Sequence, residues 1–193
     1  MSYLGFVVKA SRALLFPMYR APTSGDSCRA PSGPNALRDL TIQDMKDLQR
    51  SVDYLESRQD IDHDRIAYFG VSLGARLGSI ALAVEKRFKV AVLWSGGFSL
   101  GTKLPDMEEI NYAPRVTTPV LMLNGRDDFT FPIETSQIPM FRLLGTADAG
   151  QAPRALRRRP RLPVCAGREG HAGVVGSVSW GASVTATWLM ANR

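Results

Sequence analysis

Short apolar runs alternate along the chain with longer segments that are apolar on one side only. The runs at residues 12–19, 66–69, 89–94 and 118–124 are each short enough for a buried strand. Between them, residues 40–57 place Met45, Leu48, Val52 and Leu55 at steps of three and four, which predicts an amphipathic helix. Further helices are predicted after Gly74, to about residue 85, and at 134–144, where Pro139 interrupts the pattern. This alternation predicts an α/β fold with a mostly parallel sheet and helices on both faces.

The polar stretches divide the chain into a core and a tail. Residues 22–34 are rich in Pro, Gly and Ser, and residues 99–116 are polar, so both are predicted as loops, the second with room for a helical turn. From residue 148 onward the composition changes: Arg, Pro, Gly and Ala dominate and no helical stripe is present. We therefore expect a folded core over residues 1–147 and a basic tail over residues 148–193 that is disordered or irregular.

Composition and charge narrow the class of protein. A chain of 193 residues with 45% hydrophobic residues forms one domain, and no apolar run reaches the roughly 18 residues of a membrane span. We expect a cytoplasmic protein without a membrane partner. Residues beyond 149 hold seven arginines and one acidic residue, which accounts for the net charge of +6. No aromatic residues are interleaved with the arginines at 154–161, which disfavours nucleic-acid binding. Two Cys and two His provide poor support for a metal centre, and no cofactor is expected.

The candidate chemistry begins at the pentapeptide 70–74, Gly-Val-Ser-Leu-Gly. It lies between a predicted strand and a predicted helix, which is the setting of a nucleophile elbow. Glycines two residues either side of Ser72 leave room for a sharp, strained turn that exposes the hydroxyl. The backbone N–H of Leu73 and the positive end of the helix would then face a developing oxyanion. The alternative is an ordinary tight turn with a solvated serine.

A serine nucleophile needs a base and an orienting carboxylate. Asp127 and Asp128 both follow the strand predicted at 118–124, and either could be that carboxylate or simply part of a turn. His171 is the histidine that follows the acid, and it is either the base or an incidental residue of the tail. His63 precedes the strand that leads to Ser72, so we expect it at the opposite end of that strand, as a solvated turn residue.

The pentapeptide 70–74 together with residues 119–132 resembles bacterial α/β-hydrolases of the dienelactone hydrolase and prolyl-oligopeptidase-like group. The resemblance implies an incomplete α/β-hydrolase fold and cleavage of a small-molecule carboxylic ester, lactone or amide through an acyl-enzyme on Ser72. It implies Asp128 as the triad acid, because Asp128 is the third residue after Gly125 and lies four before Pro132. It implies Leu73 as an oxyanion donor. The oligomeric state stays open.

Two departures from the group's pattern favour an alternative, a catalytically impaired hydrolase fragment. The strands and loop that supply the second oxyanion donor in relatives have no counterpart here. The turn that carries the histidine in relatives is replaced by the arginine-rich residues 156–161. A one-base shift of reading frame is compatible with a relative-like Asp-Gly-Gly-His at this point. We hypothesise that residues 21–31 and 148–193 are frameshifted relative to the ancestral gene, which reading the DNA in all frames would test.

Overall fold

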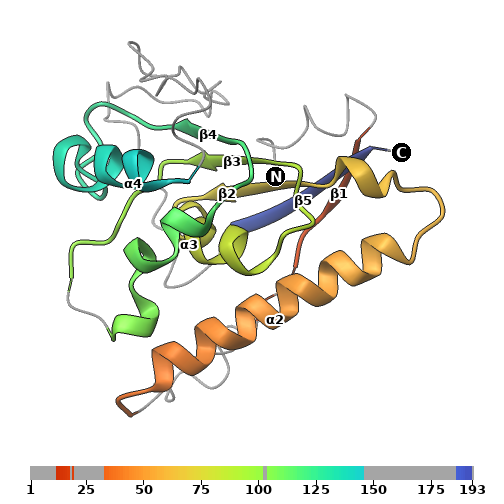
Figure 1. The fold of residues 1–193 in the computed structure, drawn as a ribbon, viewed down its shortest axis with the longest axis horizontal. Helices are drawn as coiled ribbons and strands as arrows, with labels where there is room; N and C mark the ends of the chain where they lie inside the picture. Colours follow the sequence, from red (N-terminus) through yellow and green to blue (C-terminus); the bar gives the residue numbers. More distant parts are fainter. Residues whose placement is uncertain (1–11, 18, 20–32, 102–103, 146–185, 193) are drawn as a thin grey trace, which may run out of the picture.

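The computed structural model describes residues 12–17, 19, 33–101, 104–145 and 186–192 (Figure 1). The strands are β1 (Arg12–Leu15), β2 (Ala67–Val71), β3 (Val90–Trp94), β4 (Val120–Leu123) and β5 (Ala186–Asn192). The α-helices are α2 (Ala36–Glu56), α3 (Leu73–Val84) and α4 (Ile138–Leu143). Within these ranges, no helix combines the length and the apolar character needed to cross a bilayer.

The strands form one sheet in the order β1-β5-β2-β3-β4. Strands β2, β3 and β4 are mutually parallel, whereas β5 runs antiparallel to both of its neighbours, β1 and β2. In register, Val71 lies beside Trp94, and Trp94 lies beside Leu123. The carboxyl ends of the three parallel strands therefore meet at one level of the sheet edge.

The larger core cluster lies between one sheet face and the helices. Tyr68 and Leu93 of this face are buried in the same cluster as Leu48 and Val52 of α2. Helix α3 approaches closely at Gly78, where an added Cβ would lie 2.5 Å from a methyl carbon of Leu93. Figure 1 shows α2 running along the sheet on the side of α3. The α/β fold with a parallel sheet is thus confirmed.

The opposite face of the sheet carries a smaller cluster around Phe69. Within the described part of the chain, its members are strand side chains only: Phe69, with Leu14, Val71, Val92 and Trp94 packed against it. The helical layer expected on this second face stays a prediction.

Two helices differ in extent from the sequence prediction. Helix α2 begins at Ala36 rather than at residue 40, because its first turn projects beyond the core: Leu37 is 55% exposed, so the turn adds nothing to the apolar stripe. The segment expected as one helix over 134–144 is a π-helical turn, Ile133–Gln137, followed by α4. Pro139 lies in the first turn of α4, a position that proline favours, directly after the π-helical turn.

The segment 99–116, predicted as a loop, contains three single turns of 3-10 helix, Pro105–Met107, Glu109–Asn111 and Ala113–Arg115. Residues 186–192 were assigned by sequence to the basic tail, and the structure places them in the sheet as β5. The frameshift hypothesis for residues 21–31, and for most of the tail, falls outside the described residues.

Candidate active site

Ser72 joins β2 to α3 through a strained backbone conformation. Its φ of 53° and ψ of −110° lie in a region that non-glycine residues rarely adopt, and its side chain is exposed. A Cβ on Gly70 would lie 2.5 Å from the carbonyl oxygen of Gly74, so the turn requires glycine there. The N–H of Ser72 donates to the carbonyl of Trp94 (2.9 Å), and its own carbonyl accepts from the N–H of Arg76 (2.9 Å). Ser72 therefore extends the β2–β3 ladder and begins α3 at once.

The hydroxyl of Ser72 lies at the N-terminus of α3, which is 12 residues long. The side chain of the N-cap residue, Ser72, makes no capping hydrogen bond, so it leaves the N–H groups of the first turn open to another acceptor. These N–H groups and the helix dipole favour negative charge beside Ser72. This is the setting predicted for an oxyanion held by the N–H of Leu73, and the assignment of Leu73 stays a prediction.

Asp128 lies in the loop that follows β4. Its Oδ1 accepts hydrogen bonds from the N–H groups of Thr130 and Phe131, both at 3.0 Å. These bonds fix the carboxylate in one orientation. Asp127 is exposed, and over the ranges that the structure covers it makes no hydrogen bond. The bonds to Asp128 are also those of a residue within a turn, and the assignment of Asp128 as the triad acid stays a prediction.

Ser72 and Asp128 belong to the same edge of the sheet. They follow β2 and β4, and only β3 separates these two parallel strands. Two inter-strand spacings place the two strand ends about 10 Å apart. The loops that carry Ser72 and Asp128 therefore begin on either side of the end of β3.

The loop after β3 packs against both α3 and the π-helical turn Ile133–Gln137. Ser95 also has a positive φ, 51°, and two glycines follow it. An added Cβ on Gly96 would lie 2.4 Å from the Cβ of Ala75 in α3. A Cβ added to the next glycine, Gly97, would similarly clash with the side chain of Ser136. Ser136 lies in the π-helical turn that follows the Asp128 loop. The absence of two side chains thus lets α3 and the π-helical turn pack against the same loop.

Asn124 holds that loop in place and was not identified from sequence. Its Oδ1 accepts from the N–H of Gly96 (3.1 Å), and its Nδ2 donates to the carbonyl of the same residue (2.8 Å). The side chain is buried, with 8% exposed. In the sequence, Asn124 is only an amide residue at the end of a predicted buried strand, and such a residue is ordinarily interpreted as part of a turn.

A shallow depression of about 410 Å³ lies at the loop after β4, which carries Asp128. Its lining consists of Arg126, Asp127, Asp128, Phe129, Pro132 and Ile133. Ser72 is not among these residues, so the depression lies on the Asp128 side of the edge. Phe129 is 93% exposed there.

The described residues do not place a histidine at this edge. His63 lies in a single helical turn before β2, at the opposite end of that strand from Ser72 as predicted, and its Nε2 lies 3.0 Å from the carbonyl of Arg58. His171 lies outside the described residues. Among the side chains that the structure covers, no three His, Cys, Asp or Glu residues cluster in a way that could hold a metal ion.

Residues 18–141 match the model of the dienelactone hydrolase family. Similar solved structures include a protein described as a dienelactone hydrolase from Klebsiella pneumoniae, at 24% identity and a TM-score of 0.47 over 60% of this chain and 50% of that chain. A cold-adapted esterase from an Arctic intertidal metagenomic library shows 25% identity and a TM-score of 0.45 over 58% and 49%. The acylaminoacyl peptidase of Pyrococcus horikoshii shows 19% identity and a TM-score of 0.47 over 58% and 23%. The chain spans about half the length of the first two. A comparison with curated protein sequences finds no match.

Proposed function

Because the chain belongs to the dienelactone hydrolase family, we propose that it is a serine hydrolase that cleaves a small-molecule carboxylic ester, lactone or amide. The observation that carries the proposal is the conformation of Ser72. A serine with φ of 53°, exposed at the uncapped N-terminus of α3, holds its hydroxyl where an attacked carbonyl could approach. The strain in this turn has no evident value for stability, since an ordinary turn would connect β2 to α3 without it.

In the proposed reaction, Ser72 Oγ attacks the substrate carbonyl carbon and its proton passes to a base. The N–H of Leu73 donates to the oxyanion, and collapse expels the alcohol or amine, which takes that proton. Water then attacks the Ser72 ester, releases the carboxylic acid and regenerates the serine. Asp128 is the proposed orienting carboxylate for the base, and His171 is the candidate base.

A catalytically impaired hydrolase is the second candidate. It is favoured by the absence of an imidazole at the active edge within the described residues, where His63 lies at the far end of β2. A triad without its base loses several powers of ten in rate. Under this alternative the strained turn at Ser72 is retained from an active ancestor and has no catalytic role.

Turnover of an activated ester and labelling by a fluorophosphonate separate the two candidates. We expect the unmodified chain to turn over the ester and to be labelled, and Ser72→Ala to abolish both. Ser95→Ala is the matched control, because Ser95 has a similar φ of 51° on the neighbouring strand end but starts no helix. Loss of turnover in His171→Ala would identify the base. An unmodified chain that neither turns over the ester nor reacts would establish the impaired form.

A further inference from the structure

A second buried amide lies beside the candidate acid and serves neither the sheet nor the apolar core. Gln137 ends the π-helical turn Ile133–Gln137, and only 8% of it is exposed. Burying an amide is unfavourable unless its polar atoms are paired. The partners of Gln137 are therefore informative about what this residue does.

The side chain of Gln137 closes the loop that carries Asp128. Its Nε2 donates to the carbonyl of Gly125 at 3.1 Å and to the carbonyl of Phe131 at 2.6 Å. Both carbonyls belong to the loop between β4 and the π-helical turn, one near each of its ends. One amide nitrogen thus joins the two ends of the segment 125–131 and uses both of its hydrogens.

The loop in turn holds the carboxylate. Asp128 Oδ1 accepts from the N–H of Thr130 and from that of Phe131. Phe131 is shared between the two sets of bonds, because its carbonyl accepts from Gln137 and its N–H donates to Asp128. A displacement of Phe131 therefore moves a donor away from Asp128.

Gln137 is itself held by rigid surroundings. Its N–H donates across a π-helical step to the carbonyl of Pro132 (3.2 Å). The preceding residue, Ser136, is fully buried and donates its hydroxyl to the carbonyl of Phe98 (2.6 Å). These bonds hold the π-helical turn, a feature frequent at functional sites, in place. The turn directs the side chain of Gln137 toward the loop that carries Asp128.

We propose that Gln137 is a positioning residue: it closes the loop 125–131 and thereby sets the orientation of Asp128 toward the base. The inference rests on the proposed function, because it assigns Asp128 to the catalytic machinery. It adds a residue that acts through Asp128 without touching the substrate.

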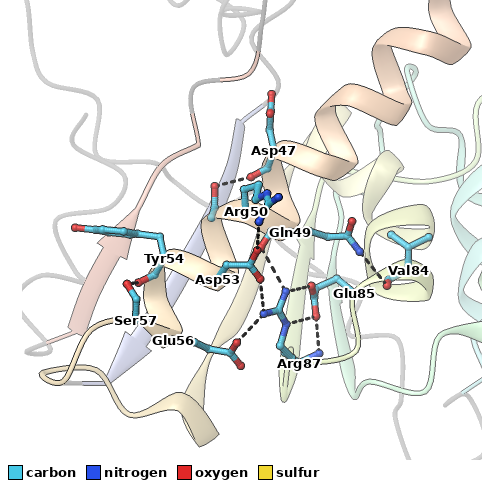
Figure 2. Close-up of polar contacts among 11 residues, drawn as sticks. Asp47, Gln49, Arg50, Asp53, Tyr54, Glu56, Ser57, Val84, Glu85 and Arg87 are labelled. Carbon is cyan, nitrogen blue, oxygen red and sulfur yellow. Dashed lines mark hydrogen bonds and ion pairs between the residues drawn. The ribbon is translucent and has the colours of Figure 1, made fainter.

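Amide hydrogen exchange tests the positioning role without any need for activity. In Gln137→Met, which has a similar length but no donor, we expect exchange at Thr130 and Phe131 to accelerate tenfold or more. The matched control is Gln49→Met, because Gln49 also donates its side-chain amide to a backbone carbonyl, that of Val84, far along the chain from this loop (Figure 2). Exchange at the two amides should be unchanged in the control. Exchange that stays within twofold in Gln137→Met would overturn the proposal.

Kinetics supply the second test. If the unmodified chain hydrolyses the activated ester, Gln137→Met should lower kcat by about 10–100-fold and leave KM within about twofold, since a small misplacement of a catalytic group has effects of this size. An unchanged kcat would overturn the role. If the unmodified chain shows no turnover, the proposed function is contradicted. The role of Gln137 is then tested by the hydrogen-exchange experiment only. Should Gln137→Met fail to fold, Gln137→Asn, a methylene too short to reach both carbonyls, replaces it in both experiments.

Discussion

Asp44 is a buried carboxyl group on the core-facing side of α2. Its side chain is 6% exposed, and its Oδ1 has no hydrogen-bond partner within the described residues. Burial, and secondarily the negative charge of Asp47, raises the pKa of Asp44 from 3.8 to about 6. The folded state therefore binds a proton more tightly than the unfolded state, and ionised Asp44 destabilises the fold at neutral pH.

We expect the free energy of unfolding to fall as pH rises from about 4 to about 6. Asp44 is protonated in both states below this window and ionised in both above it, so its effect reaches at most about 3 kcal/mol. Asp44→Asn should remove this decline, so the free energy of unfolding of Asp44→Asn minus that of the unmodified chain should be larger at pH 7.5 than at pH 4, by up to about 3 kcal/mol. Urea titrations at both pH values measure it. Asp47→Asn, at an exposed position, should change the decline only slightly. The same pH dependence in Asp44→Asn and in the unmodified chain would contradict the assignment.

The sequence identifies residues at this scale when a local motif carries them. Ser72 and Asp128 are recognisable because each follows a strand in a short pattern with fixed glycine or proline positions. Asp44 and Gln137 are not, since a polar residue within an amphipathic pattern is assigned to solvent. Their burial depends on what the rest of the fold places against them.

At the scale of elements, Arg87 joins α2 to the segment between α3 and β3 (Figure 2). Its Nη1 lies 2.8 Å from Asp53 and 2.7 Å from Glu56, and its Nη2 lies 2.6 Å from Glu85. Glu85 is 3% exposed. Burial alone would raise the pKa of Glu85, yet the hydrogen bonds from Arg87 outweigh it and hold that pKa below 4.5. Hydrogen bonding to Arg87 likewise lowers the pKa of Asp53.

Arg87→Ala should lower the free energy of unfolding by about 2–4 kcal/mol, because it leaves the charge of Glu85 buried without its partner. Arg50→Ala is the matched control: Arg50 also pairs with Asp53, but its side chain is 85% exposed, and we expect a change of about 0.5 kcal/mol or less. Chemical denaturation at neutral pH compares the two. Equal losses would mean that Arg87 is no more than a surface ion pair.

The elements that the sequence predicts well are those with strong local periodicity. The strands β2, β3 and β4 and helix α3 lie within a residue or two of the predicted ranges. The first turn of α2 lacks the three- and four-residue spacing of apolar residues, because this turn does not pack against the core. The π-helical turn has no distinct period. It is stabilised by Ser136, which bonds to the carbonyl of Phe98 in a loop distant in sequence, and by Gln137, which bonds to the loop just before the turn.

For the whole molecule, the central feature is β5, which is paired on both sides. Leu189 of β5 lies opposite Leu15 of β1 and Tyr68 of β2. We expect Leu189→Pro to lower the Tm, because proline removes a ladder donor from an interior strand. Amide exchange in β2 should accelerate as well. A chain that lacks only Arg193 is the control. An unchanged Tm in Leu189→Pro would show that β1 and β2 do not depend on this strand.

The overall topology was only partly predictable. Alternating strands and helices predict the parallel part, because each right-handed crossover follows from its neighbours in the chain. The insertion of β5 is a pairing between segments near opposite ends of the chain, and such a pairing leaves no periodic signal in either segment.

This arrangement has a consequence for folding. Strand β2, which leads to Ser72, pairs with β5 only after the chain has been synthesised through residue 192, so this edge of β2 is unpaired during synthesis. Contacts of such long sequence separation form slowly. Until they form, the unpaired edges of β1 and β2 can pair with another strand, including the same segment from another copy. High expression levels should therefore favour strand-exchanged assemblies over monomers.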